Sequence, residues 1–273
     1  MRVAVGSIIN QTYPDWTLTI IDDGTPDPSM PQWSAAIVAS DPRIRYVRNE
    51  TNLGANGNYR KALTFVTHEL AVVMGADDIM LPRYLETIVA AHTAYPDASI
   101  IQPGVQVIDE HGVCRSGTAD AIKKVLTPRG HGPRLLRGEP LAVSLMRGNW
   151  LYFPSITWRS DALLRTGFRE GFNVVQDLAL AMDIIKAGGS FVLDDTVCFQ
   201  YRRHSASDSS VRALDGSRFV EEAAYFAQEA EAFEALGWPA AARAARRHLT
   251  SRLNAATLWP KAIRAKNTSG ART

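Results

Sequence analysis

The chain of 273 residues is poor in cysteine, in long apolar runs and in excess charge of either sign. Its two cysteines, Cys114 and Cys198, form no CxxC pair, which excludes a disulfide framework or a cysteine zinc site and fits a reducing compartment. No apolar run reaches the roughly 18 residues of a membrane span, and residues 1–6 are too short for the apolar core of a signal peptide. The net charge of +2 gives no argument for nucleic acid. We therefore expect a cytoplasmic protein that binds no nucleic acid.

The sequence does contain a regular alternation of helix and strand patterns. Over the first hundred residues, helical periodicity at 3–10, 31–39, 52–67 and 83–94 alternates with apolar strand patterns at 16–21, 44–47 and 71–74. Further strands are predicted at 99–102, 104–108, 155–158, 190–193 and 196–201, and helices at 139–147, 160–165 and 175–187. This pattern predicts an α/β fold with a mostly parallel sheet and helices on both faces.

The remaining segments define the expected domain organisation. Residues 111–140, rich in Gly, Pro and basic residues, predict a long loop over the site. Residues 1–215 are expected to form the α/β domain, 216–260 a C-terminal helical extension broken at Gly237-Trp238-Pro239, and 261–273 a basic, disordered tail.

Two of the predicted strands end in a pair of aspartates. Asp22 and Asp23 follow the run 17–21, and Asp77 and Asp78 follow the run 71–76. Open α/β sheets bind their ligands at the carboxyl ends of strands. Clustered carboxylates there are costly unless a cation or a hydrogen-bonding ligand compensates them. The repeated pattern predicts a nucleotide and a metal ion in one cleft.

Eight short motifs occur in the order that is typical of one enzyme family. They are Gln11–Trp16, Ile21–Thr25, Asn52–Gly54, Ala76–Asp78, Pro82, Gly167-Phe168, Gln176-Asp177 and Tyr201–His204. With these motifs the chain resembles the family 2 glycosyltransferases, which are inverting enzymes of the GT-A fold. The resemblance implies a nucleoside-diphosphate sugar of the UDP, dTDP or GDP type, a glycan or lipid-linked acceptor, and a role in the synthesis of cell-surface polysaccharide. It also implies Mg²⁺ or Mn²⁺ as the cofactor.

The resemblance assigns roles on the donor side. Asp22 and Asp23 would face the base and accept the N3 proton of uracil or thymine. Asn52, Gly54 and Asn58 would also belong to the nucleotide site. Asp77 would bind the ribose, Asp78 and His204 the metal ion, and Arg202 and Arg203 the leaving diphosphate. The alternatives are a turn in which Asp22 caps the next helix, a structural Asp77-Asp78 pair, and an ordinary surface histidine.

On the acceptor side, the reaction needs a base that takes the proton of the attacking hydroxyl. The resemblance makes Asp177 that base, and Gln176 stands where the family usually has Glu. A carboxylate at this helix start would also stabilise the helix dipole without any catalytic role. Asn149 and Trp150 are predicted to contact the acceptor, with Trp150 stacking on a sugar face, although core packing is an alternative for the aromatic ring.

Two departures from the family bear on function. Gly75 stands where many members have Asp. The first strand of the fold, which would lie beside the strand that ends at Ile21, is missing from the sequence, so we expect two unpaired strand edges. These departures leave open a catalytically idle protein that binds a glycan or a partner. A dehalogenase-type phosphatase is disfavoured because Ile21 stands at the position of the nucleophilic Asp.

The predicted last helix allows a further hypothesis on location. Residues 239–256 place Arg243, Arg246 and Arg247 near one face, which is typical of helices that lie on anionic membranes. The alternative is a solvated helix packed on the catalytic domain. The sequence thus allows peripheral contact with the inner face of a membrane.

Overall fold

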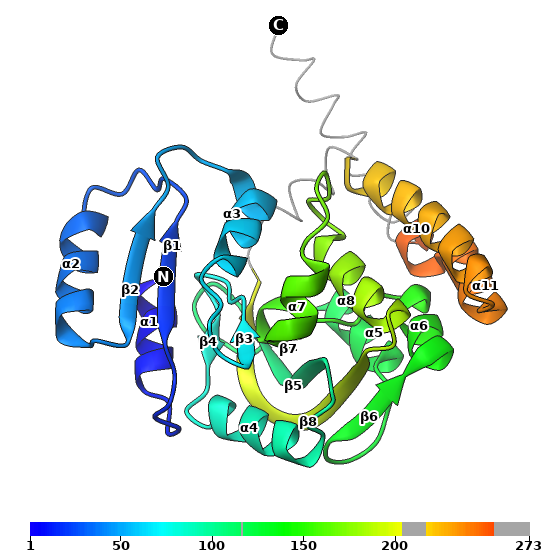
Figure 1. Ribbon diagram of the computed structural model, residues 1–273, viewed down its shortest axis with the longest axis horizontal. Helices are drawn as coiled ribbons and strands as arrows, with labels where there is room; N and C mark the ends of the chain where they lie inside the picture. Colours follow the sequence, from blue (N-terminus) through cyan, green and yellow to red (C-terminus); the bar gives the residue numbers. More distant parts are fainter. Residues whose placement is uncertain (116, 204–216, 254–273) are drawn as a thin grey trace, which may run out of the picture.

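The computed structural model describes residues 1–115, 117–203 and 217–253. Figure 1 shows a small two-stranded sheet on one side, a larger sheet in the centre and the C-terminal helices on the other side. The expected α/β fold is confirmed. The helices are α1 (Arg2–Ile9), α2 (Met30–Ser40), α3 (Gly54–Leu63), α4 (Tyr84–Ala94), α5 (Thr118–Leu126), α6 (Gly138–Arg147), α7 (Ser160–Thr166), α8 (Gln176–Lys186), α10 (Ser217–Ala235) and α11 (Pro239–Arg247).

The small sheet consists of β1 (Leu18–Asp22) and β2 (Ile44–Arg48), which run parallel. Helix α2 lies between them in the chain and makes the crossover that a parallel pair needs. Val5 of α1, Trp16, Ile20 and Ile44 form the buried apolar core of this part. The register pairs Asp22 with Arg48, which places both side chains at the carboxyl ends of their strands.

The larger sheet has the order β3-β7-β5-β8-β4, and a sixth strand, β6, also pairs with β8. These strands are β3 (Leu70–Val72), β4 (Ile79–Met80), β5 (Ile100–Ile108), β6 (Arg134–Arg137), β7 (Thr157–Arg159) and β8 (Ser190–Arg202). Only β5 and β8 pair in parallel, and the four other pairings are antiparallel. The prediction of a mostly parallel sheet is therefore corrected to a mixed sheet. A long connection that contains helices joins β5 to β8, as a parallel pair requires, and the antiparallel pairs likewise join strands that are not consecutive in the chain.

The sheet is interrupted between β1 and β3. Within the described residues, each of these strands pairs on one side only, β1 with β2 and β3 with β7. The expectation of two unpaired edges beside the strand that ends at Ile21 is confirmed. A side-chain hydrogen bond of 3.0 Å between His68 and Thr17 connects the residues that precede the two strands.

Three predicted segments differ from the structure. The strands predicted at 99–102 and 104–108 form one strand, β5, with an irregular register at Gly104, whose close approach to the Asp195 carbonyl leaves no room for a Cβ. The strands predicted at 190–193 and 196–201 likewise form one strand, β8. The loop predicted at 111–140 contains α5 and β6. Its Gly and Pro residues lie around these elements and conceal them from a periodicity search.

The C-terminal helices share the main core. Tyr225, Phe226 and Phe233 of α10 pack in the same buried cluster as α6 and α8. The small side chains of Ala241 and Ala245 allow α11 to lie close against α6 and α10. The predicted helical break at Gly237-Trp238-Pro239 is confirmed, whereas residues 254–273, which include the predicted tail, lie outside the described part of the chain.

Candidate active site

The first aspartate pair lies in the turn that follows β1. Asp22 is buried, and its carboxylate accepts hydrogen bonds from the Thr25 N–H at 2.7 Å, the Tyr46 hydroxyl at 2.6 Å and the Arg48 guanidinium at 3.1 Å. Asp22 therefore holds the turn and joins it to β2. Its direct contact with a nucleotide base remains a prediction.

Asp23 links the same turn to the start of α3. Its Oδ1 accepts hydrogen bonds from the Asn49 side chain at 2.7 Å and from the Leu53 N–H at 2.8 Å, and its carbonyl accepts one from Asn52 at 2.9 Å. Both side-chain bonds fall on Oδ1. Of the two carboxylates, Asp23 is thus the more suitable to meet a base, because Asp22 uses both of its oxygens inside the protein.

The predicted residues of α3 shape this corner. Asn52 Oδ1 accepts a hydrogen bond of 3.0 Å from the N–H of Gly54, whose φ of 71° is one that L side chains rarely adopt. Asn58 Oδ1 accepts a hydrogen bond from the same Asn49 amide at 3.0 Å. The structure therefore gathers Asp23, Asn52, Gly54 and Asn58 in one place.

The second aspartate pair follows β3 and bends back over Gly75. A Cβ at position 75 would lie 2.5 Å from Asp78 Oδ2 and 3.1 Å from Asp77 Oδ1. Both carboxylates therefore approach the same point. Gly75 is what makes the room for them, so an aspartate at this position would not fit the arrangement seen here.

Asp78 is 1 % exposed and accepts a hydrogen bond of 2.8 Å from the Arg202 N–H at the end of β8. Burial raises the pKa of its carboxyl to about 7, and the neighbouring charge of Asp77 adds to the rise. A cation bound at this point would stabilise the ionised form of both carboxylates and offset the cost of burying Asp78. Mg²⁺ and Mn²⁺ commonly take one or two carboxylates and fill their remaining positions with water and phosphate oxygens, so Asp77 and Asp78 fit such an ion.

Within the described residues, no three His, Cys, Asp or Glu side chains are grouped closely enough to enclose a metal ion on their own. The predicted ligand His204 lies outside the described residues. Of the two predicted metal ligands, the structure therefore describes Asp78 alone, and Asp77, the predicted ribose contact, lies beside it at Gly75.

Arg202 and Arg203 have protein partners. The Arg202 guanidinium donates to the carbonyls of Asp77 at 2.8 Å and Asp109 at 2.8 Å and so fixes the loop that carries the second aspartate pair. Arg203 is paired with the buried carboxylate of Asp120 on α5, at 2.6 to 3.0 Å. The predicted contact of both guanidinium groups with a diphosphate would require them to exchange or share these partners.

Asp177 stands in the first turn of α8, as predicted. Its Oδ1 is buried and has no hydrogen-bond partner among the described residues. Burial raises the pKa of its carboxyl, while the Leu178 N–H, the charge of Lys123 and the side chain of Asn149 act in the opposite direction. A desolvated carboxylate with a raised pKa has the properties of a general base.

Two side chains fix the segment that leads into α8. Gln176 is buried, and its Oε1 accepts a hydrogen bond of 2.9 Å from Asn56 of α3, which also donates to the carbonyl of Phe172 at 2.7 Å. Glu221 of α10 accepts hydrogen bonds from the backbone N–H groups of residues 173–175. Gln176 also donates from Nε2 to the Asn173 carbonyl at 3.2 Å, a bond that the carboxylate of a glutamate could not make.

Two tyrosines, Tyr59 and Tyr201, are affected by the charges of both the second aspartate pair and Asp177. Tyr59 of α3 is half-buried, and burial raises its pKa to about 12, with further contributions from the charges of Asp177, Asp78 and Asp77. Burial also raises the pKa of Tyr201 of β8, and the same three carboxylates add to that rise. The charges of the predicted base Asp177 and of the pair Asp77 and Asp78 therefore act on the same two phenol groups.

Helix α5 adds two charged residues that the sequence analysis missed. Asp120 is 6 % exposed, and its carboxylate also accepts a hydrogen bond from the Tyr152 hydroxyl at 3.1 Å. Lys123 donates to the Leu151 carbonyl and lies 4.4 Å from the centre of the Tyr152 ring. The spacing of Asp120 and Lys123, which places both on one helical face, was the available signal, and the loop prediction concealed it.

The two residues predicted to contact the acceptor lie in different surroundings: the acceptor contact of Asn149 stays a prediction, and the stacking predicted for Trp150 is wrong. Asn149 lies beside Asp177 and lowers its pKa through a side-chain hydrogen bond. Trp150 is 0 % exposed, packs edge-on against Phe191 and donates to Ser144, so its faces cannot stack on a sugar. Its ring belongs to the core because the chain turns inward between α6 and β7.

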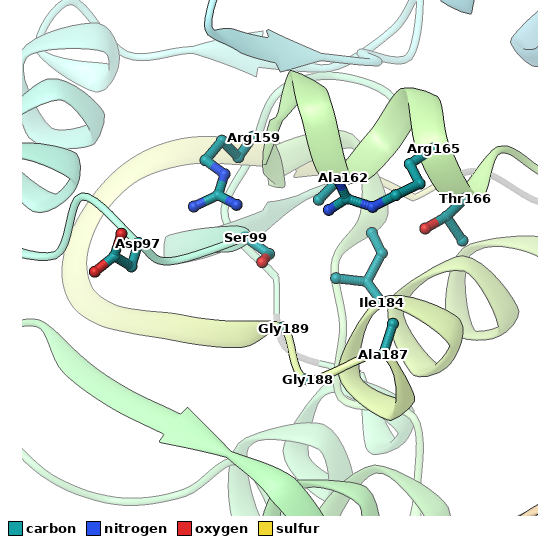
Figure 2. Close-up of a pocket in the computed structure, with 10 residues that line it drawn as sticks. All are labelled: Asp97, Ser99, Arg159, Ala162, Arg165, Thr166, Ile184, Ala187, Gly188 and Gly189. Carbon is teal, nitrogen blue, oxygen red and sulfur yellow. The ribbon is translucent and has the colours of Figure 1, made fainter.

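A separate pocket of about 230 Å³ lies where β5 and β8 begin, at the ends of these strands away from Arg202, and next to the turn at Gly188-Gly189 (Figure 2). Arg159 and Arg165 line it, but both pair with Asp161. None of the predicted site residues lines this pocket.

In the described part of the chain, no helix is both long and apolar enough to cross a bilayer.

Comparison with known proteins agrees with this geometry. The family model described as Glycosyl transferase family 2 matches residues 1–158. The putative glycosyltransferase EpsE of Bacillus subtilis is 27% identical over 141 residues, which are 50% of this chain and 51% of that protein. The glucosyltransferase WfgD of Escherichia coli, named for transfer from UDP-Glc to alpha-D-GlcNAc-diphosphoundecaprenol, is 30% identical over 86 residues, 32% of this chain and 33% of that protein.

The fold is also shared with solved structures. The mannosyltransferase PcManGT from Pyrobaculum calidifontis, in complex with GDP-Man and Mn²⁺, superposes with a TM-score of 0.61 at 16% identity and covers 98% of this chain and 70% of its own. The chain spans about half the length of the curated relative EpsE. The family match extends over more than half of the chain and includes both aspartate pairs. The chain therefore belongs to glycosyl transferase family 2 and has the GT-A fold.

Proposed function

We propose that this protein transfers a sugar from a nucleoside-diphosphate sugar to a glycan or lipid-linked acceptor, with inversion at the anomeric carbon and with Mg²⁺ or Mn²⁺ as the cofactor. The observations that carry this proposal are the carboxylates of Asp77 and Asp78, which approach one point at Gly75, and the buried Oδ1 of Asp177 at the start of α8, which has no partner among the described residues. One pair has the chemistry of a metal ligand and the third that of a base. A single-displacement transfer needs both on opposite sides of the reacting carbon.

The donor would be held by the first turn and by α3. Asp23 would accept the N3 proton of a uracil or thymine base, and Asn52, Gly54 and Asn58 surround it. Asp77 would meet the ribose with one oxygen and, because Asp78 approaches the same point at Gly75, would also help to hold the ion. A guanine base offers a donor pattern that a carboxylate also accepts, so the geometry is compatible with UDP, dTDP or GDP as the carrier.

In the chemical step, Asp177 would take the proton of the acceptor hydroxyl while the oxygen of that hydroxyl attacks the anomeric carbon. The bond from that carbon to the diphosphate oxygen breaks, and the nucleoside diphosphate leaves with the electron pair. Mg²⁺ or Mn²⁺ held by Asp78 and Asp77 would supply the positive charge that stabilises this leaving group. Asn149 lies where it can orient the base.

A lipid-linked acceptor and polysaccharide synthesis are supported by the name of the relative WfgD. We further propose a cytoplasmic location with peripheral membrane contact through α11 and the residues that follow it, where the side chains of Arg243, Arg247, Leu249 and Leu253 are exposed. Sedimentation with anionic vesicles, and its loss at high salt or in an Arg243→Gln/Arg247→Gln variant, would support this location. Equal sedimentation with neutral vesicles would contradict it.

The proposed activity is tested with a panel of UDP-, dTDP- and GDP-sugars and short glycan or lipid-linked acceptors, with Mn²⁺ or Mg²⁺. Released nucleoside diphosphate and the anomeric configuration of the product are measured. We expect one donor class to be used, with loss of activity in chelator and about 100-fold or greater loss in Asp177→Asn. The exposed Asp161→Asn is the matched control.

Two outcomes would contradict the proposal. Equal turnover by the wild type and Asp177→Asn would remove Asp177 from the role of base. No turnover of any donor, together with tight binding of an oligosaccharide, would favour the catalytically idle alternative.

A further inference from the structure

Helix α5 has the reverse polarity of an ordinary amphipathic helix, with charged residues facing the protein and apolar residues facing solvent. Asp120 and Lys123 face inward, whereas Ile122 and Val125 are 47% and 69% exposed. A surface helix normally buries its apolar face and exposes its charged residues. Burial of a lysine costs several kcal/mol unless its charge is compensated. The inward charges of α5 therefore need a reason other than packing.

The Lys123 ammonium occupies a defined position at the proposed base. It donates to the Leu151 carbonyl and lies over the Tyr152 ring. The same short segment carries Asn149, whose side chain is bonded to Asp177. Residues 149–151 thus hold Lys123 at one end and Asp177 at the other.

The charges around Lys123 identify its principal partner. Asp177 is the carboxylate that acts most strongly on Lys123, ahead of Asp120 on its own helix. The cations Arg203 and Arg218 oppose them, and the Arg203 guanidinium is paired with Asp120. Asp177 in turn faces the weakly acidic groups Tyr59, Tyr201 and Tyr225, which burial keeps neutral.

We propose that Lys123 is a positioning residue that keeps the buried carboxylate of Asp177 ionised, and so ready to accept a proton from the acceptor hydroxyl. This inference rests on the proposed function, in which Asp177 is the base. The groups that lower the pKa of Asp177 include the charged side chain of Lys123, whose positive charge favours the ionised carboxylate. It offsets part of the cost of burying a carboxylate where the acceptor must bind.

The ionisation states of the two groups are compatible. Burial lowers the pKa of Lys123 to about 8, so the ammonium is charged at neutral pH. Burial raises the pKa of Asp177, and the Lys123 charge counteracts that rise. Without the ammonium, the pKa of Asp177 would rise further and more of the base would be protonated at a given acidic pH.

The test compares Lys123→Met, Lys123→Arg and the control Lys124→Met, an exposed neighbour on the same helix. For each protein, kcat/KM is measured against pH. We expect Lys123→Met to lose about tenfold on the acidic limb of the profile and roughly twofold or less at its plateau. Lys123→Arg should restore the acidic limb, and Lys124→Met should match the wild type.

Carbon-13 NMR titration of the Asp177 carboxyl, assigned by the signal lost in Asp177→Asn, provides a readout that needs no turnover. We expect the titration midpoint to lie higher in Lys123→Met than in the wild type. If the proteins transfer sugar and neither the acidic limb nor the midpoint moves, or if activity falls equally at all pH values, the role of Lys123 is wrong. If the midpoint moves and no donor is turned over, the charge coupling stands and the proposed function fails.

Discussion

Glu221 of α10 accepts a hydrogen bond of 2.9 Å from the backbone N–H of Val175, the residue immediately before α8. The same carboxylate also accepts from the N–H groups of Asn173 and Val174. The first N–H groups of a helix have no partner within the helix itself, and a carboxylate there also interacts favourably with the helix dipole. A C-terminal helix therefore stabilises the start of the helix that carries Asp177.

Replacement of Glu221 by alanine should remove the acceptor from these backbone N–H groups. We expect the free energy of unfolding to fall by about 2 kcal/mol, the upper range for loss of a helix cap. We also expect kcat to fall about tenfold with little change in the KM for the donor, because the donor binds elsewhere. Urea unfolding and steady-state kinetics measure the two effects. The exposed Gln228→Ala on the same helix should change neither, and a loss confined to KM would contradict the assignment.

The stability of Asp177→Asn should depend on pH. Burial raises the pKa of Asp177 above that of the unfolded chain, so the folded state loses stability as the pH rises through the interval between the two values. Because asparagine does not titrate, we expect Asp177→Asn to melt about 3 °C higher than the wild type at pH 7, and the gain to vanish below about pH 4. Thermal unfolding at several pH values measures this. The exposed Asp15→Asn should show no such trend.

Gly75→Ala should weaken metal binding. The new Cβ would lie 2.5 Å from Asp78 Oδ2, so the carboxylate must move away from its present position. We expect about tenfold weaker binding of Mn²⁺ in the presence of nucleoside diphosphate, measured by calorimetry. Gly6→Ala, where a Cβ meets nothing within 4 Å, is the matched control. Unchanged affinity in Gly75→Ala would show that the two carboxylates do not hold the ion as a pair.

The two aspartates of the first turn should separate stability from nucleotide binding. Asp22→Asn has one acceptor oxygen, so it cannot accept from Tyr46 and Arg48 at one position and from the Thr25 N–H at the other. We therefore expect the free energy of unfolding to fall by about 2 kcal/mol. Asp23→Asn keeps an acceptor at Oδ1 and loses the charge, so we expect stability close to the wild type and about tenfold weaker binding of UDP or dTDP. The opposite pattern would assign the base contact to Asp22.

Much of the site follows from local sequence patterns. Asp77 and Asp78 come directly after an apolar run, and Asp177 comes at the start of a strongly periodic helix, so the local pattern predicts the element on which each lies. Trp150 was misplaced because an aromatic residue at the end of a helix gives no local sign of whether its ring faces a ligand or the core. Helix α5 was missed because its charged residues face inward and its apolar residues outward.

The sequence by itself determined the alternation of helices and strands over the first hundred residues, the two aspartate pairs, the family and the interruption of the sheet beside β1. Each of these depends on residues that are close together in the chain or on motifs that recur in order. Only the tertiary structure decided that both carboxylate oxygens of Asp22 accept hydrogen bonds within the protein and that Arg203 is paired with Asp120. It also decided that Lys123 and Glu221 support the segment around Asp177. These outcomes depend on desolvation and on contacts between residues that lie far apart in the chain, and no local pattern encodes either.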